Sequence, residues 1–117
     1  MKFPQMPYRR PDLAAIEEKT AGILRRISAA ASAEEQARAY LDFEALERET
    51  STACTLASIR HTIDTRDSFY DQENDYVDEI APALQELRQR ISLALLGSAF
   101  RRELEERFGK LLFTNLD

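Results

Sequence analysis

The chain is poor in the residues that form reactive centres and in those that interrupt helices. Its 117 residues include one cysteine, one histidine, no tryptophan, three glycines and four prolines. A single cysteine cannot form an internal disulfide. With 44% hydrophobic and 32% charged residues, this composition indicates a soluble helical protein, and the length suits one domain with its own core.

Long apolar runs and clustered positive charge are also missing. No stretch has the length of a membrane span, and the first ten residues lack the apolar centre of a signal peptide. The net charge is −5. Arginines occur as pairs of adjacent residues, and these pairs are far from one another along the chain. Nucleic-acid binders neutralise phosphates with a clustered basic surface. We therefore expect no nucleic-acid partner, no membrane partner and a cytoplasmic location.

The amino-terminal segment, residues 1–11, is predicted to be an extended arm. Pro4, Pro7 and Pro11 remove backbone donors and disfavour helical geometry in the residues before them. Because Tyr8 and other large side chains give the arm something to bury, we expect it to lie across the helices or, in a longer protein, across a neighbouring domain, rather than to form a disordered tail.

Two amphipathic helices are predicted to follow, at residues 12–30 and 33–65. Asp12 is a suitable N-cap for the first, and Ser32 with Glu35 forms a capping box for the second. The second helix carries two apolar stripes, so we expect neighbours on more than one side of it. One stripe is Leu41, Ala45, Thr52, Leu56, Ile59 and Ile63; the other is Tyr40, Phe43, Leu46, Ala53 and Ala57.

A third helix should begin near Asp67 or Ser68, and a last one should span residues 99–108 between Gly97 and Gly109. Apolar residues keep helical spacing on both sides of Pro82, which favours one kinked helix over two separate ones. The acidic residues near the start of the third helix, Glu73 among them, are predicted to form a solvated face. The expected fold is therefore an all-α antiparallel bundle of about four long helices.

The most unusual composition lies between residues 51 and 73, which hold the only histidine and many threonines and serines. Because such residues are middling helix formers, tertiary contacts must support this stretch. Arg60, His61 and Asp64 lie three or four residues apart and therefore share a helix surface, with Tyr70 shortly beyond them. This group could face a cavity and touch a peptide, or it could hold two helices together.

Three segments together resemble the amino-terminal region of the oligoendopeptidase F family, zinc metallopeptidases related to thimet oligopeptidase. They are FPQMPYRRPDL at the start, LASIRHTIDTRDSFYDQENDYVDEIAP in the middle and LLGSAFRRELEERFGKLLF near the end. The resemblance covers nearly the whole chain. It implies a peptidase that cuts short peptides in a helical cavity, using zinc held by a His-Glu-x-x-His helix and a later Glu.

The chain departs from that family in one respect, since it contains no His-Glu-x-x-His and only one histidine. It cannot supply the two imidazoles of such a site. We therefore expect no metal or other cofactor in these residues, zinc elsewhere in the complete enzyme, and no catalytic residue here. The apolar closing segment, residues 110–117, has no stop signal, as expected of a chain cut from a longer protein.

Two hypotheses follow. In the first, residues 12–117 are the helical amino-terminal region of an oligoendopeptidase F type enzyme and form part of the substrate-channel wall, with Arg60, His61, Asp64 and Tyr70 as channel candidates. Its partners would be the carboxy-terminal catalytic region of the same protein and short peptides. In the second, the chain is a free-standing helical module for protein interaction or dimerisation.

Overall fold

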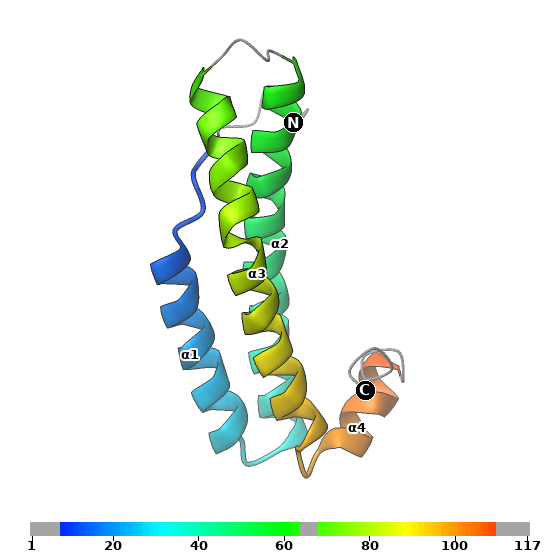
Figure 1. Ribbon diagram of the computed structural model, residues 1–117. Coiled ribbons are helices and arrows are strands. Elements are labelled where there is room, and N and C mark those ends of the chain that lie inside the picture. Colours follow the sequence, from blue (N-terminus) through cyan, green and yellow to red (C-terminus); the bar gives the residue numbers. More distant parts are fainter. Residues whose placement is uncertain (1–7, 64–67, 110–117) are drawn as a thin grey trace.

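A computed structural model describes residues 8–63 and 68–109 and shows four helices. They are α1 (Leu13–Ala29), α2 (Ala33–Ile63), α3 (Ser68–Leu96) and α4 (Arg101–Phe108). No strand occurs among these residues. Helices α1, α2 and α3 run side by side in alternating directions, and α4 turns back beside the start of α2 (Figure 1). The predicted all-α antiparallel bundle is confirmed.

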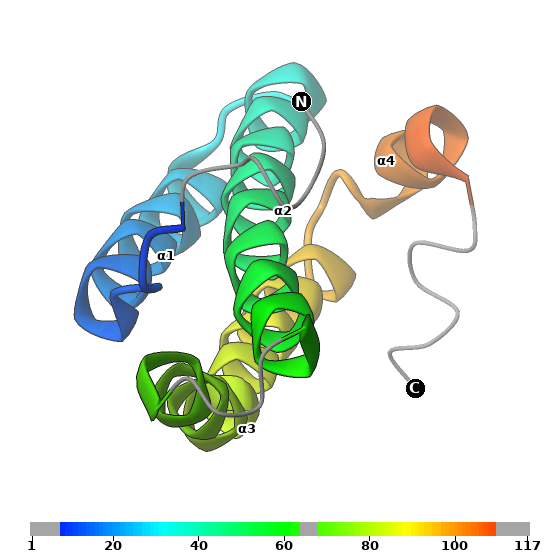
Figure 2. The ribbon, with the colours of Figure 1, turned by 90° about the horizontal axis from the view of Figure 1, so that it is seen from above.

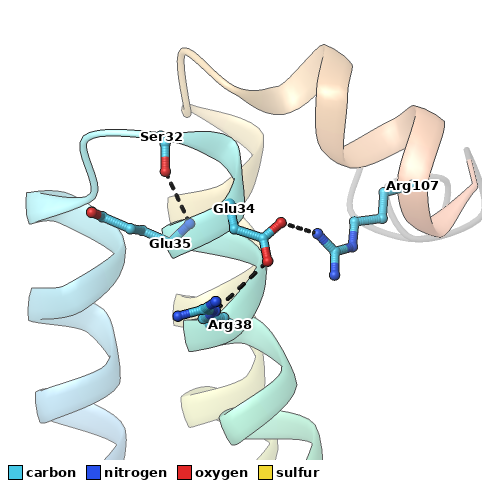
Figure 3. Close-up of polar contacts among 5 residues, drawn as sticks. All are labelled: Ser32, Glu34, Glu35, Arg38 and Arg107. Carbon is cyan, nitrogen blue, oxygen red and sulfur yellow. Dashed lines mark hydrogen bonds and ion pairs between the residues drawn. The ribbon is translucent and has the colours of Figure 1, made fainter.

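The helices begin where the predicted caps lie. The Asp12 carboxylate accepts a hydrogen bond from the Ala15 amide at 3.2 Å and starts α1. The Ser32 hydroxyl accepts one from the Glu35 amide at 3.2 Å (Figure 3). The Glu35 carboxylate in turn accepts from the Ala31 amide at 2.9 Å. This exchange satisfies amide groups that would lack partners at the start of α2.

Helix α3 continues through Pro82 as a single helix, as predicted. Pro82 is exposed on the outer side of α3, where water can satisfy the backbone carbonyl that has lost its partner. The helix ends at Leu96, and the Gly97 amide donates to the Leu93 carbonyl at 3.1 Å. One continuous α3 therefore spans the whole length of the bundle beside α2.

The core lies where α2 meets the other three helices, and Figure 2 shows α2 in the middle of them. Phe43, Ala57 and Leu56 of α2 are all buried, which confirms part of both predicted stripes. The stripe that begins at Leu41 is wrong in its first half, because Leu41 is 40% exposed and Ala45 is also exposed. None of the described helices covers that part of α2.

A buried amide fixes one end of the bundle, which we call the Gln36 end. The Gln36 side chain is 4% exposed, and its Nε2 donates to the Ile27 carbonyl at 3.0 Å. Its Oε1 accepts a hydrogen bond from the Ser98 hydroxyl. Ser98 Oγ also accepts from the Phe100 amide at 2.9 Å. Gln36 thus joins the last turn of α1 and the start of α2 to the turn between α3 and α4.

Helix α4 attaches to α2 through one buried side chain, one ring contact and one ion pair. Leu104 is 1% exposed, whereas Phe108 is only half-buried and packs edge-on against Tyr40, with ring centroids 5.3 Å apart. Arg107 donates to Glu34 at 2.6 Å, and Glu34 also pairs with Arg38 at 3.6 Å (Figure 3). These contacts hold α4 against the first turns of α2.

The boundaries of α4 differ slightly from those predicted. The helix begins at Arg101 rather than at Ala99, because the Ser98 hydroxyl binds the Phe100 amide in the preceding turn. Phe100 is half-buried rather than buried. At the other end the prediction is confirmed, since Gly109 has φ 86° and its amide donates to the Glu105 carbonyl at 2.8 Å. A left-handed φ suits glycine at this position.

Replacing Gln36 by alanine should lower the free energy of unfolding by about 2 kcal/mol, because the Ile27 carbonyl keeps only the longer bond from the Ala30 amide, at 3.4 Å, the Ser98 hydroxyl loses its acceptor, and a void opens. The measurement is urea denaturation followed by circular dichroism. Gln85→Ala on the exposed side of α3 is the matched control and should change stability by less than about 0.5 kcal/mol. Equal stability of the two variants would show that Gln36 does not hold this end together.

Candidate functional site

Arg60 and Tyr70 meet where α2 ends and α3 begins, at what we call the Tyr70 end. Arg60 Nη1 donates to the Tyr70 hydroxyl at 2.9 Å. The Arg60 guanidinium also lies 5.7 Å from the centre of the Tyr70 ring. That ring packs edge-on against Tyr8 and Phe69, with centroid distances of 5.8 Å and 4.9 Å. Residues from the arm, α2 and α3 therefore form one aromatic and cationic cluster.

His61 lies one position further along α2 and faces α3. Its Nδ1 is buried and has no hydrogen-bond partner among the described residues, and a carboxylate oxygen of Asp71 lies 3.9 Å away. That distance is too long for a hydrogen bond but suits an ion pair when the imidazole is protonated. The structure thus brings together three of the four predicted candidates, Arg60, His61 and Tyr70. The fourth, Asp64, lies outside the described residues.

The same cluster extends to a buried carboxylate on α3. Glu73 is only 5% exposed. The Tyr8 hydroxyl donates to its Oε1 at 2.8 Å, and Arg10 Nε lies 3.2 Å from the same oxygen. Burial, and then the hydrogen bond to Glu73, raises the pKa of the Tyr8 hydroxyl, which therefore remains a donor at neutral pH. Two partners from the arm thus compensate the carboxylate for its lost hydration.

Two further contacts fasten the arm to α3. The Tyr76 hydroxyl donates to the Pro11 carbonyl at 2.7 Å. The Arg10 guanidinium lies over the Tyr76 ring, 3.8 Å from its centre. The prediction that the arm lies across the helices is confirmed for residues 8–11, while residues 1–7 lie outside the described part.

Glu73 corrects one prediction, since it belongs to the interior and not to the solvated acidic face. The reason is the arm, which covers this turn of α3 and supplies Tyr8 and Arg10. A signal was present in the sequence: Glu73 precedes Val77, Ile80 and Leu84 at helical spacing and so continues the apolar stripe of α3 towards its start. An acidic residue in an apolar stripe indicates a buried, paired carboxylate.

The Tyr70 end offers donors and aromatic faces rather than a nucleophile beside a base. A guanidinium, phenol hydroxyls and an imidazole can bind a peptide carbonyl or a terminal carboxylate. Among residues 8–63 and 68–109, no group of three or more His, Cys, Asp or Glu side chains could hold a metal ion. A zinc-peptidase site needs two imidazoles, and the chain has one histidine, so its residues do not fit such a site.

An apolar cavity of about 270 Å³ lies further along the bundle, between α1, α2 and α3. Ile16, Phe43, Leu84 and Leu87 line it, together with the thiol of Cys54. Burial raises the pKa of this thiol. At neutral pH the thiol of Cys54 is therefore protonated, and Cys54 is an apolar lining residue of the cavity rather than an activated nucleophile.

These features define an all-helical region whose described residues include no cluster that could hold a metal ion. The model of the peptidase M3 N-terminal domain matches residues 3–117. The chain therefore belongs to this family of zinc-dependent peptidases, and the part of the family that it matches is the amino-terminal domain.

No curated protein matches the chain. No helix in the described part is long and apolar enough to cross a membrane.

Three solved structures are similar, each with a TM-score of 0.92. PZ peptidase A, solved with an inhibitor, is 38% identical over 96% of this chain. A protein assigned as oligoendopeptidase F is 42% identical over 97% of it. Another, from Bacillus anthracis strain Ames, is 35% identical over 97%. The chain spans only 20%, 20% and 21% of those three proteins.

Replacing Glu73 by alanine should release the arm, because Tyr8 and Arg10 lose their shared acceptor. Trypsin should then cut the Arg9–Arg10 bond at least about tenfold faster, which corresponds to about 1.4 kcal/mol of lost protection. Mass spectrometry of a digestion time course measures the rate. Glu79→Ala, on the exposed side of the same helix, is the control. Unchanged cleavage in Glu73→Ala would mean that the arm is held by other contacts.

Cys54 should react slowly with a disulfide reagent such as dithionitrobenzoate. Because its pKa is raised in the folded state, fewer molecules carry a thiolate at a given pH than in the unfolded chain. At pH 8 we expect the folded chain to react at least about tenfold more slowly than the chain in urea. Free glutathione, assayed with and without urea, corrects for the solvent. Equal rates would contradict the burial of Cys54.

Proposed function

We propose that the chain is the amino-terminal helical region of an oligoendopeptidase F type zinc metalloendopeptidase that hydrolyses short peptides. The observation that carries this proposal is the match to an oligoendopeptidase F over 97% of this chain but only 20% of that protein. In the proposed enzyme the zinc ligands and the general base lie outside these 117 residues. The present chain forms part of the wall of the substrate channel.

The Tyr70 end is the part of this wall that we propose to face the peptide. Arg60, His61, Asp64 and Tyr70 are the candidate contacts for a peptide backbone or terminus. Arg60 supports this role because a guanidinium binds carboxylates with two parallel hydrogen bonds. Its contact with Tyr70 would orient it for that task, and the same contact holds the start of α3 against the end of α2.

A free-standing interaction or dimerisation module is the competing proposal. It would use the exposed apolar side chains of Leu41, 40% exposed, and Leu93, 56% exposed, which a second copy or a partner would cover. Sedimentation equilibrium separates the two proposals. If the chain is an interaction module, it should be a dimer at micromolar concentration. If it is the enzyme region, the isolated chain should be a monomer, because its contacts in the enzyme are with the catalytic region.

The decisive experiment replaces the matched fifth of the 42%-identical oligoendopeptidase F by this chain. We expect the hybrid to hydrolyse a quenched fluorescent peptide in a zinc-dependent manner, within about tenfold of the parent rate, because the folds have a TM-score of 0.92. The 117 residues alone, supplied with zinc, should show no turnover. A folded, zinc-loaded hybrid without activity, or turnover by the isolated chain, would refute the proposal.

In the active hybrid, Arg60→Ala should raise KM by about tenfold, because the loss of one charge-assisted hydrogen bond costs about 1.5 kcal/mol. The rate at saturating peptide should change less. Arg25→Ala, at an exposed position near the end of α1, is the control and should leave both constants unchanged. An unaltered KM in Arg60→Ala would leave Arg60 with a structural role only.

A further inference from the structure

A second candidate surface is an open groove between α1 and α2, which borders the arm at Arg10 and Pro11. Its volume is about 740 Å³. The floor is apolar and includes Ile16, Leu46 and Leu56, while the walls carry Arg9, Lys19 and Arg48. A smaller hollow continues it along the same two helices past Gly22, as far as Arg26 and Asp42, which pair at 2.6 Å.

Four cations line this groove, and three of them lack partners among the described residues, while the fourth, Arg10, pairs with Glu73. Within residues 8–63 and 68–109, eight arginines have an ion pair or a hydrogen bond to another side chain: Arg10, Arg26, Arg38, Arg60, Arg88, Arg90, Arg101 and Arg107. Arg9, Lys19 and Arg48 are exposed, and no described residue pairs with them. The carboxylates of the groove are fewer, since Asp12 caps α1 and Glu49 alone is left unpaired. This groove is therefore positive, although the chain as a whole carries −5.

Part of the apolar floor is also more exposed than the spacing of apolar residues along α2 predicts. Ala45, Thr52 and Leu56 line the groove and belong to the stripe of α2 that was expected to be buried. Leu56 is buried, but Ala45 is exposed. The part of this stripe around Ala45 has core spacing but is left exposed by the described residues, which is typical of a contact surface.

We infer that the groove between α1 and α2 docks an acidic amphipathic helix, and that this helix belongs to the catalytic region of the longer enzyme. The apolar side of such a helix would cover the floor, while its carboxylates would pair with Arg9, Lys19 and Arg48. The assignment of this helix to the catalytic region rests on the proposed function. The matched proteins are about five times longer than this chain, so a large body of protein adjoins this domain in such an enzyme. Two of the three cations lie on different helices, so docking would also tie α1 to α2.

Lys19 provides a direct test because it is the only lysine among the described residues. Its acetylation by an N-hydroxysuccinimide ester is measured by mass spectrometry in the isolated chain and in the hybrid enzyme described above. We expect acetylation in the hybrid to be at least tenfold slower. An Arg25→Lys variant supplies a control lysine on the same helix, outside the groove, and it should react equally fast in both proteins.

Charge reversal gives an independent measurement. Lys19→Glu with Arg48→Glu should lower the melting temperature of the hybrid by several degrees more than Arg25→Glu with Arg102→Glu, which reverses two unpaired cations elsewhere. In the isolated chain the two double variants should melt alike. A carbodiimide cross-link from Lys19 to an Asp or Glu of the catalytic region would identify the docked helix.

The outcomes separate this inference from the proposed function. An active hybrid in which Lys19 reacts as fast as in the isolated chain would overturn the docking inference and leave the enzyme proposal intact. Protection of Lys19 in the isolated chain at high concentration, with a dimer in sedimentation, would overturn it in favour of a second copy as the occupant. Protection in a hybrid without peptidase activity would support docking and contradict only the proposed function.

Discussion

The structure depends on the burial of α2 against the other helices, at positions between residues 36 and 43 and again at residues 56 and 57. This helix is rich in serine and threonine, and the hydroxyls of Thr50 and Thr62 bind carbonyls four residues earlier, at 2.9 Å and 3.0 Å. Such side-chain bonds do not stabilise an isolated helix in water. Contacts with α1, α3 and α4 supply the missing stability, and buried residues such as Phe43, Leu56 and Ala57 are where they act. The Tyr70 end, the apolar cavity and the groove beside α1 all include residues of this helix.

Much of the fold could be predicted from the sequence because its signals are local. Asp12, the pair Ser32 and Glu35, and Gly109 each act within a few residues, and the structure places the helix ends beside them. The family assignment also followed from contiguous segments, and the match over residues 3–117 bears it out. Pro82 was correctly placed within one helix because apolar spacing continues on both sides of it.

Interactions between distant residues could not be predicted in the same way. Glu73 looks like one acid among many until Tyr8 and Arg10 are brought over it, and Gln36 looks like an ordinary polar helix residue until it meets Ser98. Of the candidate site, local spacing placed Arg60 and His61 on one stretch of α2, and the structure brings both beside the start of α3. It could not show which side of that group a peptide would approach, because that depends on protein beyond these residues.

The order of contacts along the chain has a consequence for its synthesis. Tyr8 and Glu73 are 65 residues apart, and Gln36 and Ser98 are 62 apart, so each end of the bundle closes only when α3 arrives. On the ribosome, α1 and α2 can pair early as a helical hairpin, but the face of α2 that receives α3 then stays bare. Until residue 98 has left the exit tunnel, the nascent hairpin therefore keeps apolar surface exposed that the finished bundle buries.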